Sequence, residues 1–276
     1  MSYTLFMRLA GPMQSWGVSS RFGIRETLTE PSKSGVIGIL CAALGWDRAT
    51  PTHLIAGKNR TLADLSALRF GVRVVQEGVV RRDYHTAQNV LRAKAKLRPG
   101  KPVSDSDLQE TVLSERYYLA DAYFLVGLES DDETLLRALD EALNQPHWPL
   151  RLGRKAFLPS LPLRYATVAA SDQPAQVSVV NQPLAQALLT TQDTAWLNLS
   201  QRARKFWGPQ GDNSTPIMPA LRYVVDAGEA SSTIDGLTLT PVRQVQRADV
   251  PLSFEPRRFA PRDVLIYTIN HSHVPV

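Results

Sequence analysis

A short polar segment, Pro31-Ser32-Lys33-Ser34-Gly35, has residue types that could bind an anion. It precedes an apolar run that ends at Gly45, so the stretch predicts a helix over 32–44. Ser32 or Ser34 can cap this helix, and its first turn offers backbone N–H groups beside Lys33, an arrangement that suits phosphate. A buried helix with an ordinary capped start explains the same residues. The Walker spacing G-x-x-x-x-G-K-[ST] is absent, which argues against a nucleoside triphosphatase.

The loop that precedes this helix interleaves aromatic and polar side chains. Trp16 and Phe22 stand among Gln14, Arg21 and Arg25. Aromatic rings beside arginines can stack on bases and bind phosphates, so Arg21 and Arg25 are candidate RNA contacts. The alternative is a loop whose aromatic residues anchor it in the core, and this alternative is favoured for Phe22.

A run of positive charges predicts an extended arm. Arg92, Lys94, Lys96 and Arg98 recur at every second position, Lys101 follows, and no acidic residue occurs from 88 to 102. On a strand, this period places the first four cations on one face. The segment therefore predicts a basic arm or β-hairpin that binds nucleic acid, against the alternative of a solvated surface loop.

The chain offers few groups for catalysis. Its histidines lack metal-binding spacing, and no G-x-S-x-G nucleophile motif is present. Tyr84, His85 and Lys155 form the only plausible hydrolytic set, which could activate a ribose 2′-hydroxyl without a metal. Binding without chemistry is the favoured interpretation, and neither a metal nor a cofactor is expected.

Composition is compatible with a polyanionic partner. The 276 residues carry a net charge of +5, and the pI is about 9.4. Cys41 is the only cysteine, so disulfides and cysteine-based metal sites are excluded. The N-terminus lacks a signal-peptide profile, and no apolar run reaches about 18 residues. We therefore expect a soluble cytoplasmic protein.

The elements that would position these residues follow an α+β order. Up to about residue 152 the patterns predict a strand, a helix, two strands, a helix and a strand, over 3–10, 32–44, 68–80, 115–129, about 131–144 and near 150–152. This order, β-α-β-β-α-β, is ferredoxin-like or RRM-like. We expect one domain over 1–162, with the basic hairpin arm at about 82–116, and a smaller β-rich region over 163–276.

Several segments, in order along nearly the whole chain, resemble a known family. They are Leu9-Ala10-Gly11-Pro12-Met13-Gln14-Ser15-Trp16-Gly17, Pro31-Ser32-Lys33-Ser34-Gly35-Val36-Ile37-Gly38, Arg82-Asp83-Tyr84-His85-Thr86, Arg116-Tyr117-Tyr118-Leu119-Ala120-Asp121-Ala122, Leu152-Gly153-Arg154-Lys155 and Arg258-Phe259-Ala260-Pro261-Arg262. The chain resembles the Cas-five (RAMP) family, and in particular its members that are subunits of the subtype I-E CRISPR surveillance complex Cascade.

This resemblance implies a ferredoxin-like RAMP fold with a thumb-like hairpin, and a structural role in antiviral defence. The subunit would hold the 5′ handle of the CRISPR RNA and cap the backbone filament. Its neighbours would be a Cas-seven-family backbone subunit and the large subunit CasA, and it would meet target DNA indirectly, through the complex. Family members of subtype I-C cleave precursor RNA, so a metal-independent endoribonuclease is the alternative.

The residues expected to contact RNA under this interpretation come from five segments. They are Gln14, Ser15, Trp16, Arg21, Arg25, Ser32, Lys33, Ser34, Gly35, Tyr84, His85, Thr86, Arg92, Lys94, Lys96, Arg151, Arg154 and Lys155.

Overall fold

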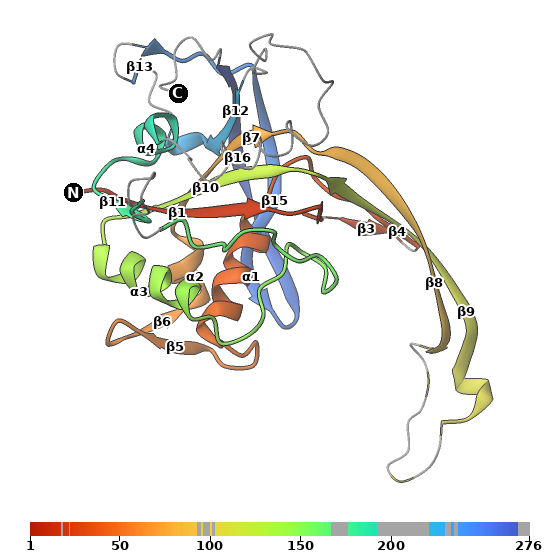
Figure 1. Cartoon of the computed structure of the whole chain (residues 1–276). Coiled ribbons are helices and arrows are strands. Elements are labelled where there is room, and N and C mark those ends of the chain that lie inside the picture. Colours follow the sequence, from red (N-terminus) through yellow and green to blue (C-terminus); the bar gives the residue numbers. More distant parts are fainter. Residues whose placement is uncertain are drawn as a thin grey trace, which may run out of the picture.

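A seven-stranded antiparallel sheet forms the centre of the computed structural model (Figure 1). The model describes residues 1–17, 19–21, 23–92, 95, 100, 103–166, 176–191, 221–229, 233–234 and 237–269. The strand order is β11-β1-β10-β7-β12-β16-β15. The strands are β1 (Tyr3–Ala10), β7 (Arg69–Gln76), β10 (Tyr123–Ser130), β11 (Val179–Val180), β12 (Leu221–Asp226), β15 (Arg243–Phe254) and β16 (Arg257–Ile269).

Helices cover both faces of this sheet. α1 (Lys33–Leu44), α2 (Leu62–Ser66) and α3 (Glu133–Asn144) lie on one side, and α4 (Leu184–Thr190) lies on the other (Figure 1). α1 begins where the Ser32 Oγ accepts a hydrogen bond from the Gly35 N–H, at 3.3 Å, and it ends at Gly45, whose φ is 69°. The helix predicted over 32–44 therefore corresponds to α1.

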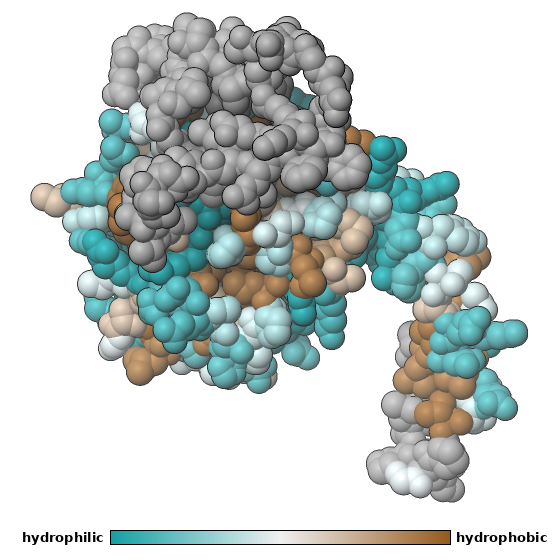
Figure 2. Space-filling view, in the orientation of Figure 1, coloured by the Kyte–Doolittle hydropathy of each residue, from teal (hydrophilic) through white to brown (hydrophobic). Residues whose placement is uncertain are grey.

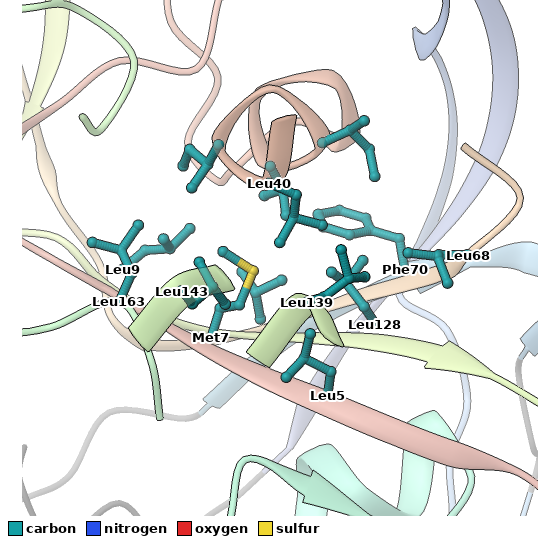
Figure 3. Close-up of a cluster of buried hydrophobic side chains, with 14 of the residues drawn as sticks. Leu5, Met7, Leu9, Leu40, Leu68, Phe70, Leu128, Leu139, Leu143 and Leu163 are labelled. Atoms are coloured by element: carbon teal, nitrogen blue, oxygen red, sulfur yellow. The ribbon is translucent and has the colours of Figure 1, made fainter. Parts of the chain in front are cut away.

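Each face of the sheet has its own apolar cluster. Leu40 of α1 and Leu139 of α3 pack against Met7 and Phe70 on one face (Figure 3). On the other face, Leu184 and Leu188 of α4 pack over the paired glycines of β7 and β10. A Cβ at Gly127 would lie 2.5 Å from Leu184 Cδ1, so only glycine lets α4 approach this closely.

A long two-stranded hairpin projects from the body (Figure 1). It consists of β8 (Val79–Leu91) and β9 (Leu108–Ala120), with the 3₁₀ turn η1 (Asp105–Asp107) before β9. Three short strands pair at its root: β2 (Met13–Gln14) and β4 (Ile24–Arg25) pair with β9, and β3 (Ser20–Arg21) pairs with β4. The structure thus has a hairpin where the basic arm was predicted.

Four short strands and one turn complete the described elements. β5 (Thr52–Ile55) pairs with β6 (Lys58–Thr61), and β13 (Thr233–Ile234) pairs with β14 (Leu237–Thr238). The 3₁₀ turn η2 (Ala227–Glu229) follows β12.

The observed elements differ from the predicted ones in three places. The strands predicted over 68–80 and 115–129 are each divided, at 77–78 and at 121–122, where the chain passes between the central sheet and the hairpin. The segment 150–152 is not a strand, and β11 lies beside β1 instead. The strands β12, β15 and β16 all lie within the β-rich region predicted over 163–276, and they extend the central sheet, because β12 pairs with β7.

Candidate nucleic-acid interface

The N-terminus of α1 is occupied by a carboxylate of the chain itself. The Lys33 N–H donates to Asp249 Oδ2 at 2.8 Å, and Asp249 is fully buried. The Lys33 ammonium, 3.3 Å from Asp226 Oδ2, is also buried. Arg262 contacts both carboxylates. The Asp249 carboxylate therefore occupies the helix N-terminus where a phosphate was predicted. Lys33 is buried against Asp226 and has a structural role.

Gln14 and Trp16, both predicted to contact RNA, are buried. The Gln14 Nε2 donates to the carbonyls of Leu9 and Ala122, at 3.1 and 2.7 Å, and its Oε1 accepts from the Trp16 indole at 3.2 Å. A Cβ at Gly35 would lie 2.9 Å from the Trp16 ring. The hydrogen bonds of Gln14 fix the loop at the root of the hairpin. The Trp16 ring fills the space between this loop and the first turn of α1.

The loop around Gly153 meets the same segment backbone to backbone. Gly153 has a φ of 98°, and a Cβ there would lie 2.0 Å from the Ser15 carbonyl oxygen. The Ser15 N–H donates to the Leu152 carbonyl at 3.0 Å. Glycine is required here by both conformation and space, and it sets Arg154 and Lys155 beside the 15–17 loop.

These contacts assemble one wide groove of about 830 Å³. Seven cations line it, against one acidic residue, Glu26. The cations are Arg25, Arg48, Arg116, Arg151, Arg154, Lys155 and Arg257. The predicted residues that also line it are Ser15, Trp16, Ser32, Ser34 and Gly35. Such an excess of one charge in a concave surface favours a polyanion.

Charge repulsion within the groove is clearest at Arg154. Burial lowers the pKa of its guanidinium, and the nearby charge of Arg116 lowers it further, while Asp83 opposes them. Its Nη2 donates to the Tyr117 carbonyl at 2.7 Å, and its guanidinium lies over the Phe157 ring. Its Nη1 is buried and has no hydrogen-bond partner among the described residues. An anion in the groove would relieve the repulsion between Arg154 and Arg116.

Four of the remaining predicted residues lie on or beside the strand β8 of the projecting hairpin and do not line the groove. Tyr84 is 62% exposed, Thr86 and Arg92 are exposed, and His85 is half-buried. Apolar and polar surface alternate along this arm (Figure 2). Lys94, Lys96 and the side chain of Arg21 lie outside the described residues.

Three of the cations that line the groove and both of its phenylalanines were not predicted as RNA contacts: Arg48, Arg116, Arg257, Phe254 and Phe259. Arg116 begins one of the segments that carry the family resemblance, and Arg257 begins a polar-basic stretch of the sequence. Arg48 carries no pattern, because it follows the last turn of α1 in an irregular loop. The pairing of β15 with β16, and the packing of β15 against α1, bring Arg257 and Phe259 to the groove.

Metal-binding and membrane-spanning features are absent from the described part of the chain. No group of three or more histidine, cysteine, aspartate or glutamate residues is arranged there to hold a metal ion. None of the helices described is long and apolar enough to cross a membrane.

Comparison with known proteins places the chain in a family. The family model described as CRISPR-associated protein (Cas_Cas5) matches residues 4–264. Over 178 residues, covering 61% of this chain and 72% of the relative, the sequence is 34% identical to the CRISPR system Cascade subunit CasD of Escherichia coli (strain K12).

Two solved structures are similar over almost the whole chain. One, titled "Crystal structure of Cas protein", is 32% identical, with a TM-score of 0.61 and coverage of 99% of this chain and 97% of that one. The other, titled "CRISPR RNA-guided surveillance complex", is 27% identical, with a TM-score of 0.60 and coverage of 99% and 93%. The chain therefore belongs to the Cas_Cas5 family of CRISPR-associated proteins.

Proposed function

We propose that this chain is the RNA-binding structural subunit of a type I-E Cascade surveillance complex, and that it holds the 5′ handle of the guide RNA. One observation carries the proposal: a groove with seven cations and one acidic residue, in a protein of this family. Arg48, Arg151, Lys155 and Arg257 make no ion pair with any described residue, so their charges remain available for phosphates.

The hairpin has a separate role in this proposal. It begins beside the groove, since Arg116 of β9 lines the groove and β4 pairs with β9 at that point. From there it extends well beyond the body (Figure 1). We assign it to the junction between handle and spacer, where Tyr84 and Arg92 would contact the RNA.

The fold assignment that accompanies this function is a ferredoxin-like unit. The supporting observation is the order β11-β1-β10-β7, with every neighbouring pair antiparallel. α1 connects β1 to β7, and α3 follows β10 before the chain reaches β11. The hairpin is then an insertion between the second and third strands of this unit.

The partners proposed are the CRISPR RNA, a Cas-seven-family backbone subunit and the large subunit CasA, with target DNA met through the complex. Capping of the backbone filament belongs to the same proposal. It is supported by the relative that is a Cascade subunit and by the similar structure titled as a CRISPR RNA-guided surveillance complex.

The alternative, metal-independent RNA cleavage by Tyr84, His85 and Lys155, is less favoured by the geometry. Tyr84 and His85 are neighbours on β8, where they pair with Glu115 and Ser114 respectively. Successive side chains of a strand point to opposite faces, so these two do not converge on one ribose. Lys155 lies in the groove, whereas the other two do not line it. We therefore assign no catalytic residue.

Incubating the purified full chain with labelled repeat RNA in EDTA separates the two functions. We expect a retarded RNA–protein complex and intact RNA. Site-specific cleavage that disappears in the His85→Ala variant would overturn the binding role and establish the nuclease. Failure of the wild-type chain to bind this RNA at low salt would overturn both.

A further inference from the structure

We infer that the β15–β16 hairpin is a second RNA-binding element, in which Phe259 stacks on a nucleobase and Arg257 contacts a phosphate. The inference deepens the proposed function and rests on it, since the groove must first bind RNA. It concerns the exposed segment Arg257-Arg258-Phe259, which the structural contacts of the sheet do not otherwise explain.

The alternation of β16 selects which of these side chains reach the groove. Arg257 and Phe259 both line it, and so does Phe254, which pairs with Arg257 across the hairpin. Arg258 stands between them and is exposed, but it does not line the groove. Side chains two residues apart on a strand share a face, so a cation and an aromatic ring face the groove together.

The hairpin is held firmly enough to present these groups in one place. The Ser66 Oγ of α2 donates to the Pro251 carbonyl at 2.7 Å, and β15 packs against α1 and α2 (Figure 1). Nearer the sheet, Arg262 contacts Asp249 at 2.7 Å. The contact with α2 and the ion pair between the two strands therefore order the hairpin before any ligand binds, which lowers the entropic cost of binding.

Phe259 has the surroundings of a base-stacking residue. Its side chain is 39% exposed in a groove lined by seven cations, an environment that disfavours an apolar partner on its own. Single-stranded RNA satisfies both features, because phosphates bind the cations and every base offers a flat face to an aromatic ring. Phe254 also lines an adjoining hollow of about 580 Å³ with Trp148 and Leu252, so the aromatic surface continues beyond Phe259.

Affinity for labelled single-stranded RNA of the cognate 5′ handle, measured by fluorescence anisotropy over a salt series, tests both contacts. We expect Phe259→Ala to weaken binding roughly 5- to 100-fold without changing the salt slope. Phe259→Trp should restore the affinity. Arg257→Gln should weaken binding and reduce the slope of log affinity against log salt by about 0.7. The matched control, Arg258→Gln, should resemble the wild type in slope.

Each contrary result has its own meaning. Absence of binding by the wild type overturns the proposed function itself. A wild type that binds, with a Phe259→Ala variant of equal affinity, overturns only the stacking contact, as does failure of Phe259→Trp to restore binding. Loss of subunit assembly with unchanged RNA affinity would assign Phe259 to a protein partner instead. Equal thermal unfolding midpoints for all variants exclude misfolding as the cause.

Discussion

Lys33 illustrates how a residue placed at a plausible ligand site can serve the fold instead. Its backbone N–H and its ammonium bind the carboxylates of Asp249 and Asp226, which come from β15 and β12. Burial lowers the pKa of this lysine, while Asp226 opposes the shift. Lys33 thus joins the start of α1 to two strands that are more than 190 residues away along the chain.

Replacing Lys33 with glutamate should destabilise the fold. The variant removes the cation and places a new carboxylate beside Asp226 in a buried site, so the free energy of unfolding should fall by about 3–5 kcal/mol. Lys33→Met leaves Asp226 paired with Arg262 and should cost less. Urea unfolding of both variants measures the difference. If Lys33→Glu unfolded like the wild type and lost only RNA affinity, the phosphate role of Lys33 would be restored.

The ion pairs of Glu30 should make the free energy of unfolding depend on pH in the acidic range. Burial alone would raise the pKa of this carboxyl group, but the contacts with Arg247 and Arg222 outweigh burial and lower its pKa from the ordinary value of 4.5. The folded state therefore binds a proton less readily than the unfolded chain. The stabilisation from Glu30 is complete above about pH 4.5 and is lost as the pH falls through the lowered pKa.

Glu30→Gln should remove this contribution to the acid limb of a stability profile. Urea unfolding from pH 6 to about pH 3 should show a shallower fall in the variant than in the wild type, from a lower starting stability. Glu110→Gln, a substitution of an exposed residue on β9, controls for the change in net charge. Parallel profiles for wild type and Glu30→Gln would contradict the role of Glu30.

At the scale of elements, the root of the projecting hairpin is tied to the body, whereas its outer part is exposed. Its root pairs with β4, and the Glu115 N–H donates to the Gly23 carbonyl at 2.9 Å. None of the described residues between 88 and 111 is buried. The outer part of the arm therefore adds no apolar core to the body, which is compatible with the RNA-binding role proposed for it.

Shortening this arm should leave the body intact and weaken RNA binding. Residues 88–111 can be replaced by Asn-Gly, because Ala87 and Val112 are paired and a two-residue turn can join them. We expect a thermal unfolding midpoint close to that of the wild type and a lower affinity for RNA that spans the handle–spacer junction. Handle RNA alone, which should bind unchanged, is the control. Equal losses for both RNAs would show that the arm instead supports the groove.

The sequence predicted the bounds of an element well where a single apolar periodicity covers a single helix or strand. β1 and α1 match their predicted ranges because their alternation, cap and terminal glycine are local signals. The predicted strands over 68–80 and 115–129 each concealed a change of sheet. Gly78 and Asp121, whose φ is 55°, turn the chain there, and alternation of apolar residues carries no information about which neighbour a strand pairs with.

At the scale of the whole molecule, strand pairing between distant segments determines how the C-terminal strands join the sheet, which the sequence patterns do not show. β12 pairs with β7, and β16 pairs with β12, so the predicted β-rich region completes the central sheet. The same pairing brings Arg257 to a groove whose other cations come from the first 155 residues. Sequence patterns identified Arg25, Arg154 and Lys155 as candidate RNA contacts. That Arg257 and Phe259 of β16 line the same groove could be seen only from the tertiary structure.

The groove gathers cations from distant parts of the chain. The salt dependence of RNA affinity should therefore depend on how many of these cations contact phosphates. Binding of single-stranded RNA loses about 0.7 in the slope of log affinity against log salt for each phosphate contact removed. The double variant Arg151→Gln/Lys155→Gln should therefore lower the slope by about 1.4 and weaken binding most at low salt. Lys58 lies on β6 outside the groove and, among the described residues, makes only an exposed ion pair with Asp132, so Lys58→Gln removes a charge but no groove cation and should keep the wild-type slope. Equal changes in slope for the two variants would mean that net charge, rather than the groove, governs the interaction.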